Sequence, residues 1–333
     1  MSTLTPRGPV WVAVRQHRPA LWTALLLMVL SVGCVVAARV WVGSAGAMVS
    51  CGKGCSYGTT ASGWFRWAEN YIGGAAVLLP LVVVAFTAGP LIARELESGT
   101  YRLAWTQSVS PARWLTVRLA GAAAIATAGA VLLAATFRWS RSYSQDDEFL
   151  SMARSWSDRE VYPALGVTVV GYVLLAVAVG ALAAVLLRRT LLAMAAGLAA
   201  TGGVSLFFAW VRPYLWPVVK AEGGAEVDPF TASPDPWIVR EGVVLADGSR
   251  MTYEQCWDMG FSKSPCDPGS TTAVARFYEY HPDSHFWPLQ LVETGIVLVL
   301  AAAATDDDGG KHDGGPMPPE APRDPAPSGG SGK

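Results

Sequence analysis

The sequence contains little charge. Of its 333 residues, 15% are charged and 52% are hydrophobic, whereas an ordinary globular domain carries about a quarter charged residues. The formal net charge is −1, so the total charge does not indicate a nucleic-acid partner. Because the apolar residues also gather in long runs, the composition argues against a large soluble core and predicts a membrane protein.

The sequence also lacks the motifs of nucleotide binding and catalysis. No GxxxxGK[ST] phosphate loop is present. The nearest string, "AMVSCGKGC" at 47–55, lacks the first glycine and the Ser or Thr that should follow the lysine. No histidine pair or nucleophile–base set is evident, and Glu69 and residues 146–148 are interpreted as solvated loop acids. We therefore expect neither an enzyme nor a cofactor or metal site.

Six long runs with few charges hold most of the apolar residues. A helix rises about 1.5 Å per residue, so about twenty residues cross a hydrocarbon core of about 30 Å. The sequence therefore predicts an all-α integral membrane protein with six transmembrane helices. The expected spans are residues 20–42, 71–93, 115–137, 161–187, 190–211 and 286–305.

The first and last runs each leave an alternative. The first run follows the N-terminal segment 1–19, and residues 45–47 (Ala-Gly-Ala) resemble a signal-peptidase site, but the run exceeds the 7–15 apolar residues of a signal peptide. The last run is cut off by three aspartates at 306–308. It either begins near Phe286 and encloses Glu293, or crosses the membrane incompletely.

Glu293 and Gln290 are the polar candidates within the sixth span. Glu293 is the only acidic residue in any expected span, and an ionisable residue inside a membrane is a functional candidate by default. It would either line a translocation path or anchor the helix at the outer interface. Its candidate partners are Arg39, Arg138 and Arg212.

The basic residues predict the orientation of the loops. Those on one expected face are Arg7, Arg15, Arg18, Arg94, Arg102, Arg113, Arg118, Arg188 and Arg189. Those in the short loops of the other face are Lys53, Arg66, Arg138, Arg141, Arg154 and Arg159. The positive-inside rule places the richer face, and both termini, in the cytoplasm. The long loop 212–285 is then extracellular.

Cysteine placement agrees with this orientation. Cys51, Cys55, Cys256 and Cys266 fall in loops expected outside, where disulfides persist. Of the three possible pairings, the local pairs Cys51–Cys55 and Cys256–Cys266 are favoured, and four free thiols are the alternative. The fifth cysteine, Cys34, lies inside the first span.

The loop 212–285 and the tail 306–333 differ sharply in composition from the apolar runs. The loop 212–285 is rich in proline and is expected to form either a small cap of strands and turns or an irregular solvated loop. Within it, "VVLADGSRMTY" at 243–253 predicts a hairpin with Asp247 and Gly248 at the turn. The tail 306–333 is dominated by proline, glycine and acidic residues and is expected to be disordered.

A short polar segment, "ARELESGTYRLAWTQSVSPARWL" at 93–115, separates the second and third runs. Gly99 can adopt the conformation that ends a helix. Thr100 can cap a new helix from Tyr101 to about Gln107, and Ser110-Pro111 is typical of the start of the third span. The pattern predicts a short cytoplasmic helix suited to receive a push from a partner. A plain interfacial loop is the alternative.

This segment resembles the coupling segment between spans two and three of ABC exporter permeases, in the drug- and polysaccharide-exporting class. The pattern is Glu95-x-Glu97-x-Gly99-Thr100, then Leu103, Val109-Ser110 and Arg113. More narrowly, the chain is similar to a family of actinobacterial permease-like membrane proteins over about residues 10–304. The strings that carry this are "VRQHRPAL" at 14–21, residues 92–115, "RPYLWP" at 212–217 and "FWPLQLVETGI" at 286–296.

The resemblance implies a permease subunit in the cell membrane that moves an amphipathic or hydrophobic compound outward. Its partners would be a second permease, either an identical copy or a related chain, and a cytoplasmic ATP-binding subunit that supplies the missing phosphate loop. Residues 10–18 would form an interfacial helix. The residues implied to contact the ATPase are Glu95, Glu97, Gly99, Thr100, Leu103, Trp105 and Gln107. The alternative is a non-transporting sensor that acts through its extracellular loop.

Overall fold

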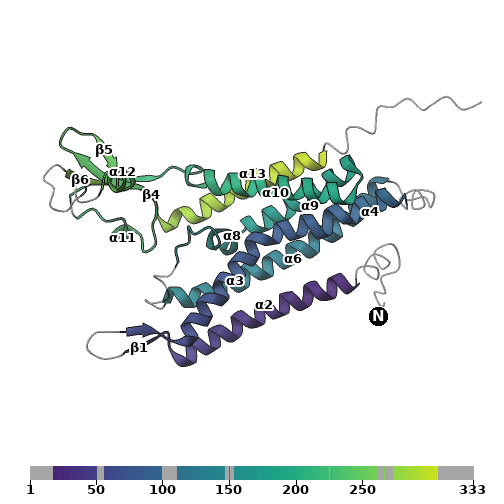
Figure 1. The fold of residues 1–333 in the computed structure, drawn as a ribbon, viewed down its shortest axis with the longest axis horizontal. Coiled ribbons are helices and arrows are strands. Elements are labelled where there is room, and N and C mark those ends of the chain that lie inside the picture. Colours follow the sequence, from purple (N-terminus) through teal and green to yellow (C-terminus); the bar gives the residue numbers. More distant parts are fainter. Residues whose placement is uncertain are drawn as a thin grey trace, which may run out of the picture.

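The computed structural model describes residues 18–50, 56–99, 111–146, 154–224, 226–260 and 273–306, together with Leu150 and Cys266. Six helices in this part are long and apolar enough to cross a membrane: Leu25–Ala45, Thr60–Phe86, Arg118–Gln145, Thr168–Leu187, Thr190–Tyr214 and Asp283–Thr305. They lie side by side, with the β-structure at one end of the bundle (Figure 1). The six candidate spans and the mostly helical architecture are confirmed, whereas the β-structure departs from the expected all-α class.

The helices of the bundle are α2 (Arg18–Ala45), α3 (Thr60–Val83), α4 (Gly89–Ser98), α6 (Pro111–Asp146), α9 (Thr168–Leu187), α10 (Thr190–Val211) and α13 (Phe286–Asp306). The π-helix η1 (Val84–Ala88) joins α3 to α4, and the short helix α8 (Val161–Leu165) precedes α9. Two 3-10 turns, η2 (Arg212–Tyr214) and η4 (Asp283–His285), flank the polar loop.

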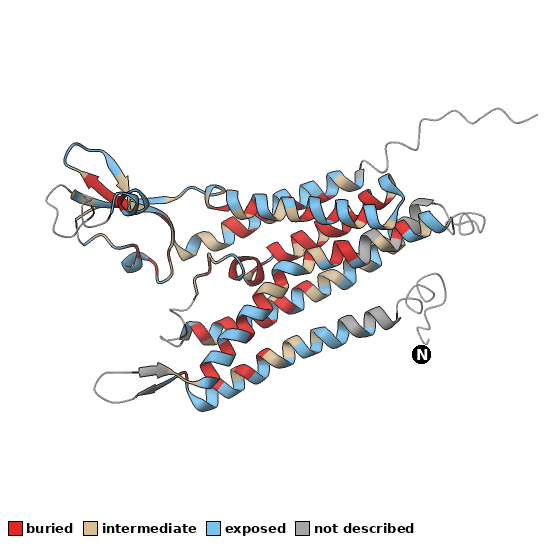
Figure 2. Cartoon of the chain, in the orientation of Figure 1, coloured by how far each residue is buried: buried red, intermediate tan, exposed pale blue. Residues whose placement is uncertain are grey.

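Helix α9 is the centre of the bundle. It is apolar all round, which is typical of a helix surrounded by others, and 67% of its spanning window is buried, against 22% for α2. It packs against α3, α4, α6, α10 and α13. Figure 2 shows the resulting contrast, with buried residues concentrated on the central helices and exposed residues along α2. The outward faces are apolar, as expected where lipid replaces water.

The second membrane helix begins at Thr60, not at Tyr71 as the run of uncharged residues predicts. Thr59 caps it, because its hydroxyl accepts a hydrogen bond from the Ser62 amide. The first turns therefore include Glu69, which is only 5% exposed and is not the solvated loop acid that the sequence suggested. Pro80 lies inside this helix, and the π-helix η1 begins directly after the helix ends.

The fourth expected span, 161–187, is divided. Gly166 is extended and separates α8 from α9. A side chain at position 166 has no room, because a Cβ there would lie 2.4 Å from Oε1 of Gln290. The Gln290 side chain thus occupies the space at the break, which a hydropathy pattern does not reveal.

The loop between the fifth and sixth spans folds into a four-stranded antiparallel sheet. Its strands are β3 (Val219–Gly223), β4 (Trp237–Leu245), β5 (Arg250–Thr252) and β6 (Ala273–His281), in the order β3-β6-β4-β5. The predicted hairpin is confirmed as β4–β5. At its turn Gly248 has a φ of 81°, and the Asp247 carboxylate accepts hydrogen bonds from the amide and hydroxyl of Ser249 at 2.9 and 2.7 Å.

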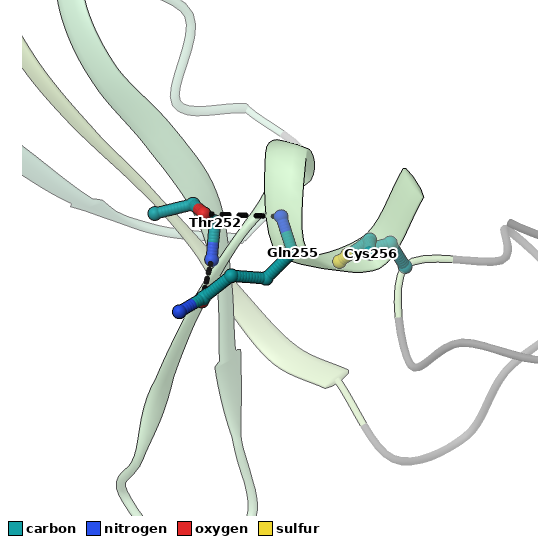
Figure 3. The surroundings of a disulfide bond; sticks show 4 residues. Thr252, Gln255 and Cys256 are labelled. Atoms are coloured by element: carbon teal, nitrogen blue, oxygen red, sulfur yellow. Dashed lines mark hydrogen bonds between the residues drawn. A yellow bond between two sulfur atoms is a disulfide. The ribbon is translucent and has the colours of Figure 1, made fainter. Parts of the chain in front are cut away.

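Two short helices, α11 (Pro229–Ala232) and α12 (Tyr253–Asp258), accompany the sheet. A capping box starts α12, with reciprocal bonds between Thr252 and Gln255 (Figure 3). Cys256 on α12 and Cys266 are joined as a disulfide, with their Cα atoms 6.1 Å apart. Both are buried, so the bridge closes a small core against the sheet.

Several expectations fall on other parts of the chain. Cys51 and Cys55 lie outside the described residues, between strands β1 (Met48–Ser50) and β2 (Ser56–Gly58). The expected helix at 101–107, the N-terminal segment before Arg18 and the tail after Asp306 also lie outside them. The pairing Cys51–Cys55 and the tail's disorder therefore stay predictions.

Gly197 on α10 provides a test of the packing at η1. A Cβ there would lie 2.6 Å from Cγ2 of the buried Val84. We expect Gly197→Ala to lower the free energy of unfolding by about 1–3 kcal/mol through overpacking, measured as a loss of thermal stability in detergent. Gly203→Ala on the same helix is the matched control, because nothing lies within 4 Å of its Cβ position. Equal stability of the two variants would contradict the packing.

Candidate functional site

The helix end at Gly99 and the next helix start at Pro111 lie where the sequence predicted them. The helix stops at Ser98, and Gly99 follows with a φ of 71°, a conformation that glycine adopts without strain. Helix α6 then begins at Pro111, where proline is favoured because its missing amide has no helical partner. Thr100, Leu103, Trp105 and Gln107 lie between these points, outside the described residues.

Both acidic residues of the predicted coupling segment bind other helices of this chain. Glu95 forms an ion pair with Arg118 of α6, with Oε1 and Nη2 2.7 Å apart. The Oε2 atom of Glu97 accepts hydrogen bonds from the amide and hydroxyl of Thr190, at 3.1 and 2.7 Å. These bonds hold the pKa of the Glu97 carboxyl below its ordinary value. The end of α4 is thereby fastened to the starts of α6 and α10.

The Glu97 contact is also a helix cap. Thr190 is the first residue of α10, and the initial amides of a helix have no partner within it. A carboxylate at this position satisfies one of them and interacts favourably with the positive end of the helix dipole. A displacement of α4 would therefore act directly on α10.

A second polar cluster lies at the opposite end of the bundle, around Glu293 of α13. Glu293 is 0% exposed and Arg212 of η2 is 4% exposed. The Arg212 guanidinium donates from Nε to Oε2 of Glu293 at 2.8 Å and from Nη2 to Oε1 at 3.0 Å. The Tyr172 hydroxyl of α9 donates to Oε1 at 2.8 Å. One carboxylate therefore joins α9, η2 and α13.

Arg212 is thus the partner of Glu293 among the three arginines that the sequence offered. Arg39 instead lies over the Trp139 ring, with Cζ 4.0 Å from the ring centroid. Arg138 donates to the Leu165 carbonyl oxygen at 3.1 Å and lies over the Trp287 ring. Since both Glu293 oxygens accept bonds from within the chain, the carboxylate joins helices in this conformation.

Gln290, one turn before Glu293, satisfies the backbone at the break between α8 and α9. Its Nε2 donates to the Tyr162 carbonyl oxygen at 2.6 Å, and its Oε1 accepts from the Thr168 amide at 3.0 Å. The Thr168 hydroxyl also donates to Oε1. A broken helix in a membrane needs such partners, because lipid offers none. Gln290 is fully buried and closes the break.

The histidines of the junction connect the sheet to the same cluster. His281, at the end of β6, lies with Nε2 2.9 Å from the Pro213 carbonyl oxygen and Nδ1 3.1 Å from Nδ1 of His285. Because a carbonyl only accepts, Nε2 carries the proton and Nδ1 accepts from His285. Pro213 directly follows Arg212, so the sheet is fastened next to the Glu293 ion pair.

Sequence reasoning missed the partners that complete both clusters. Thr190, Tyr172 and Thr168 are ordinary helix residues in the sequence. Only packing brings Thr190 to Glu97, Tyr172 to Glu293 and Thr168 to Gln290. A hydroxyl at the first position of a helix was the one available signal for Thr190. Among the described residues, no three His, Cys, Asp or Glu side chains are grouped so that they could hold a metal ion.

Removing one partner of the buried ion pair gives the sharpest energetic test. Arg212→Met leaves Glu293 buried without its cation and is expected to lower the free energy of unfolding by about 3–5 kcal/mol. Arg212→Met combined with Glu293→Gln should recover most of this, because the charge is gone and Tyr172 keeps an acceptor. Thermal unfolding in detergent measures both. Arg240→Met, which removes an exposed partner 3.9 Å from Glu279, is the control and should cost under about 1 kcal/mol.

His281 predicts a pH dependence of stability. Burial lowers the pKa of the His281 imidazole, so the folded protein keeps this residue neutral. The unfolded chain takes up a proton below about pH 6.5, and the folded chain resists it, so stability is lost as the pH falls through this region. His281→Gln retains an N–H donor for Pro213 and should flatten the thermal stability profile between pH 7 and 5. His312→Gln is the control. An unchanged slope in His281→Gln would contradict the assignment.

A family model described as ABC-2 membrane transporter related matches residues 20–212. No curated protein and no solved structure matches the chain. The matched segment runs from α2 through α10 and contains the contacts of Glu95 and Glu97. Because it covers more than half of the sequence, the chain belongs to the ABC-2 membrane transporter related family, as a multi-pass membrane protein of the permease kind.

Proposed function

We propose that this chain is the membrane subunit of an ABC exporter and that residues 93–107 receive the movement of a separate ATP-binding subunit. The observation that carries the proposal is the pair of bonds at the end of α4. Glu95 holds Arg118 of α6, and Glu97 holds Thr190 of α10. A force applied where the chain leaves α4 at Gly99 therefore reaches three membrane helices at once.

The charge distribution supports a cytoplasmic position for this end. Arg94 and Arg118 lie beside the α4 contacts, and Arg188 and Arg189 form the adjoining turn between α9 and α10. Such a concentration of arginine at short turns favours the cytoplasmic side. The sheet with its Cys256–Cys266 disulfide is at the other end (Figure 1), and an oxidising exterior suits a disulfide. Both termini would then be cytoplasmic.

The family implies association with an ATP-binding subunit. We further propose that two copies of this chain form the transport path, and that the exported compound is amphipathic or hydrophobic. The weakly charged spans support such a compound, because a strongly polar one would have few partners among them. ATP hydrolysis would come entirely from the partner, since the sequence has no phosphate loop.

A second function, a membrane sensor, has one observation in its favour. The segment between the fifth and sixth spans folds into a sheet closed by a disulfide. A folded domain of this kind can bind a ligand or a partner outside the membrane. The sensor needs no ATP-binding subunit, so co-purification of one with the tagged chain separates the two functions.

The coupling proposal predicts the effect of removing both acids. Glu95→Ala with Glu97→Ala releases α4 from α6 and α10, so the ATPase activity of the co-purified complex should lose its dependence on the permease. We expect a drop of at least about fivefold, the lower end of couplings between distant sites. Glu97→Gln keeps an acceptor for Thr190 and should be intermediate.

The control is Glu254→Ala, which removes an acidic residue from α12 at the opposite end. It should leave the ATPase activity of the complex unchanged. Membrane insertion of every variant is checked by its yield in the membrane fraction. Normal ATPase activity in the doubly substituted chain, with normal insertion, would contradict the coupling role.

A further inference from the structure

Four polar side chains line a cavity at the end of the bundle that carries the sheet. Arg66, Glu69 and Asn70 come from neighbouring turns of α3, and Arg154 comes from the segment that follows α6. The cavity has a volume of about 110 Å³. Since about 10–15 Å³ suffices for one water molecule, it has room for a chemical group much larger than water. None of its residues takes part in the two clusters described above.

Glu69 is the buried carboxyl group of this cavity. Its Oε1 atom accepts hydrogen bonds from the hydroxyls of Ser140 and Ser144 of α6, each at 3.2 Å. In the part of the chain that the structure describes, no basic side chain forms an ion pair with it. The nearby Arg141 donates instead to the Arg154 carbonyl oxygen. Arg141 and Arg154 act on the Glu69 carboxyl only from a distance and form no ion pair with it. A ligand ammonium that donates directly to this buried group would therefore be stabilised here.

The two arginines supply the opposite charge. Arg154 forms an ion pair with Glu160 at 2.8 Å, and Arg66 forms none within the described residues. Guanidinium groups suit phosphate oxygens because their N–H donors match the geometry of these acceptors. With the Asn70 amide beside them, the cavity offers donors for an anion next to a carboxylate for a cation. It is therefore complementary to a zwitterion.

Aromatic residues on the same turns of α3 indicate the level in the membrane at which the cavity lies. Trp64, Trp67 and Tyr71 are about half exposed. Trp64 meets Trp67 edge to face, with ring centroids 5.5 Å apart, and Trp67 stacks on Tyr71 at 5.7 Å. Exposed tryptophan and tyrosine gather at the level of the lipid headgroups. The cavity therefore lies where a phospholipid headgroup can reach it.

We propose that this cavity binds the phosphoethanolamine headgroup of a phospholipid. The phosphate would lie between Arg66 and Arg154, and the ammonium would donate to Glu69. A choline headgroup has no N–H to donate to the carboxylate, and a phosphoglycerol headgroup has no cation. The inference does not depend on the transport function proposed above.

Lipid binding to the purified full chain tests the proposal. Native mass spectrometry would compare retention of phosphatidylethanolamine, phosphatidylcholine and phosphatidylglycerol with identical acyl chains. We expect preferential retention of phosphatidylethanolamine. Glu69→Gln should lower this retention about tenfold, the effect of losing one charge-assisted hydrogen bond, and should not lower the retention of phosphatidylglycerol, whose headgroup has no cation to pair with Glu69. Arg66→Gln should weaken all three lipids.

Arg159→Gln is the matched control, because Arg159 is an exposed arginine in the segment that contains Arg154 and does not line the cavity. If Glu69→Gln fails to fold, Arg66→Gln carries the test, since Arg66 is exposed. Soluble phosphoethanolamine at high concentration should compete with the lipid. Binding of the soluble compound without the lipid would overturn the lipid assignment. Equal retention of the three lipids, unaffected by Glu69→Gln, would overturn the site.

Discussion

The fold depends on one constraint of the bilayer, which is that a polar group without water must find its partner inside the protein. The bond between Glu293 and Arg212 meets this constraint, because a bidentate ion pair and the Tyr172 hydroxyl satisfy both carboxylate oxygens. Three membrane helices thereby acquire one relative position. Gln290 does the same for the backbone that the break before α9 leaves open.

Helix α10 connects the two polar ends of the molecule. Its first residue, Thr190, is bonded to Glu97 of α4, and Arg212, which follows its last residue, is bonded to Glu293. The next residue, Pro213, accepts a bond from His281 of the sheet. A movement of α4 can therefore pass along a single rigid helix to the junction with the sheet. Such a connection is what a transporter needs if energy is released on one side and a path opens on the other.

The membrane architecture could be predicted from the sequence, because runs of apolar residues report directly on lipid contact. The helix stop at Gly99, the start at Pro111 and the turn at Asp247 and Gly248 also followed, because each depends on local backbone chemistry. The start of the second helix did not, since a charged residue was assumed to end a span. Hydrogen bonds from two serines of α6 accommodate the buried Glu69 inside that helix, and such a contact has no local signal.

The proposed coupling requires that the end of α4 faces the cytoplasm and that the sheet faces outward. Labelling single-cysteine substitutions with a membrane-impermeant maleimide tests this most directly, with the unsubstituted chain as background. We expect Ser249→Cys, in the β4–β5 turn, to react in intact cells, and Ser98→Cys to react only after the membrane is permeabilised. Labelling of Ser98→Cys in intact cells would contradict the orientation and the proposed coupling together.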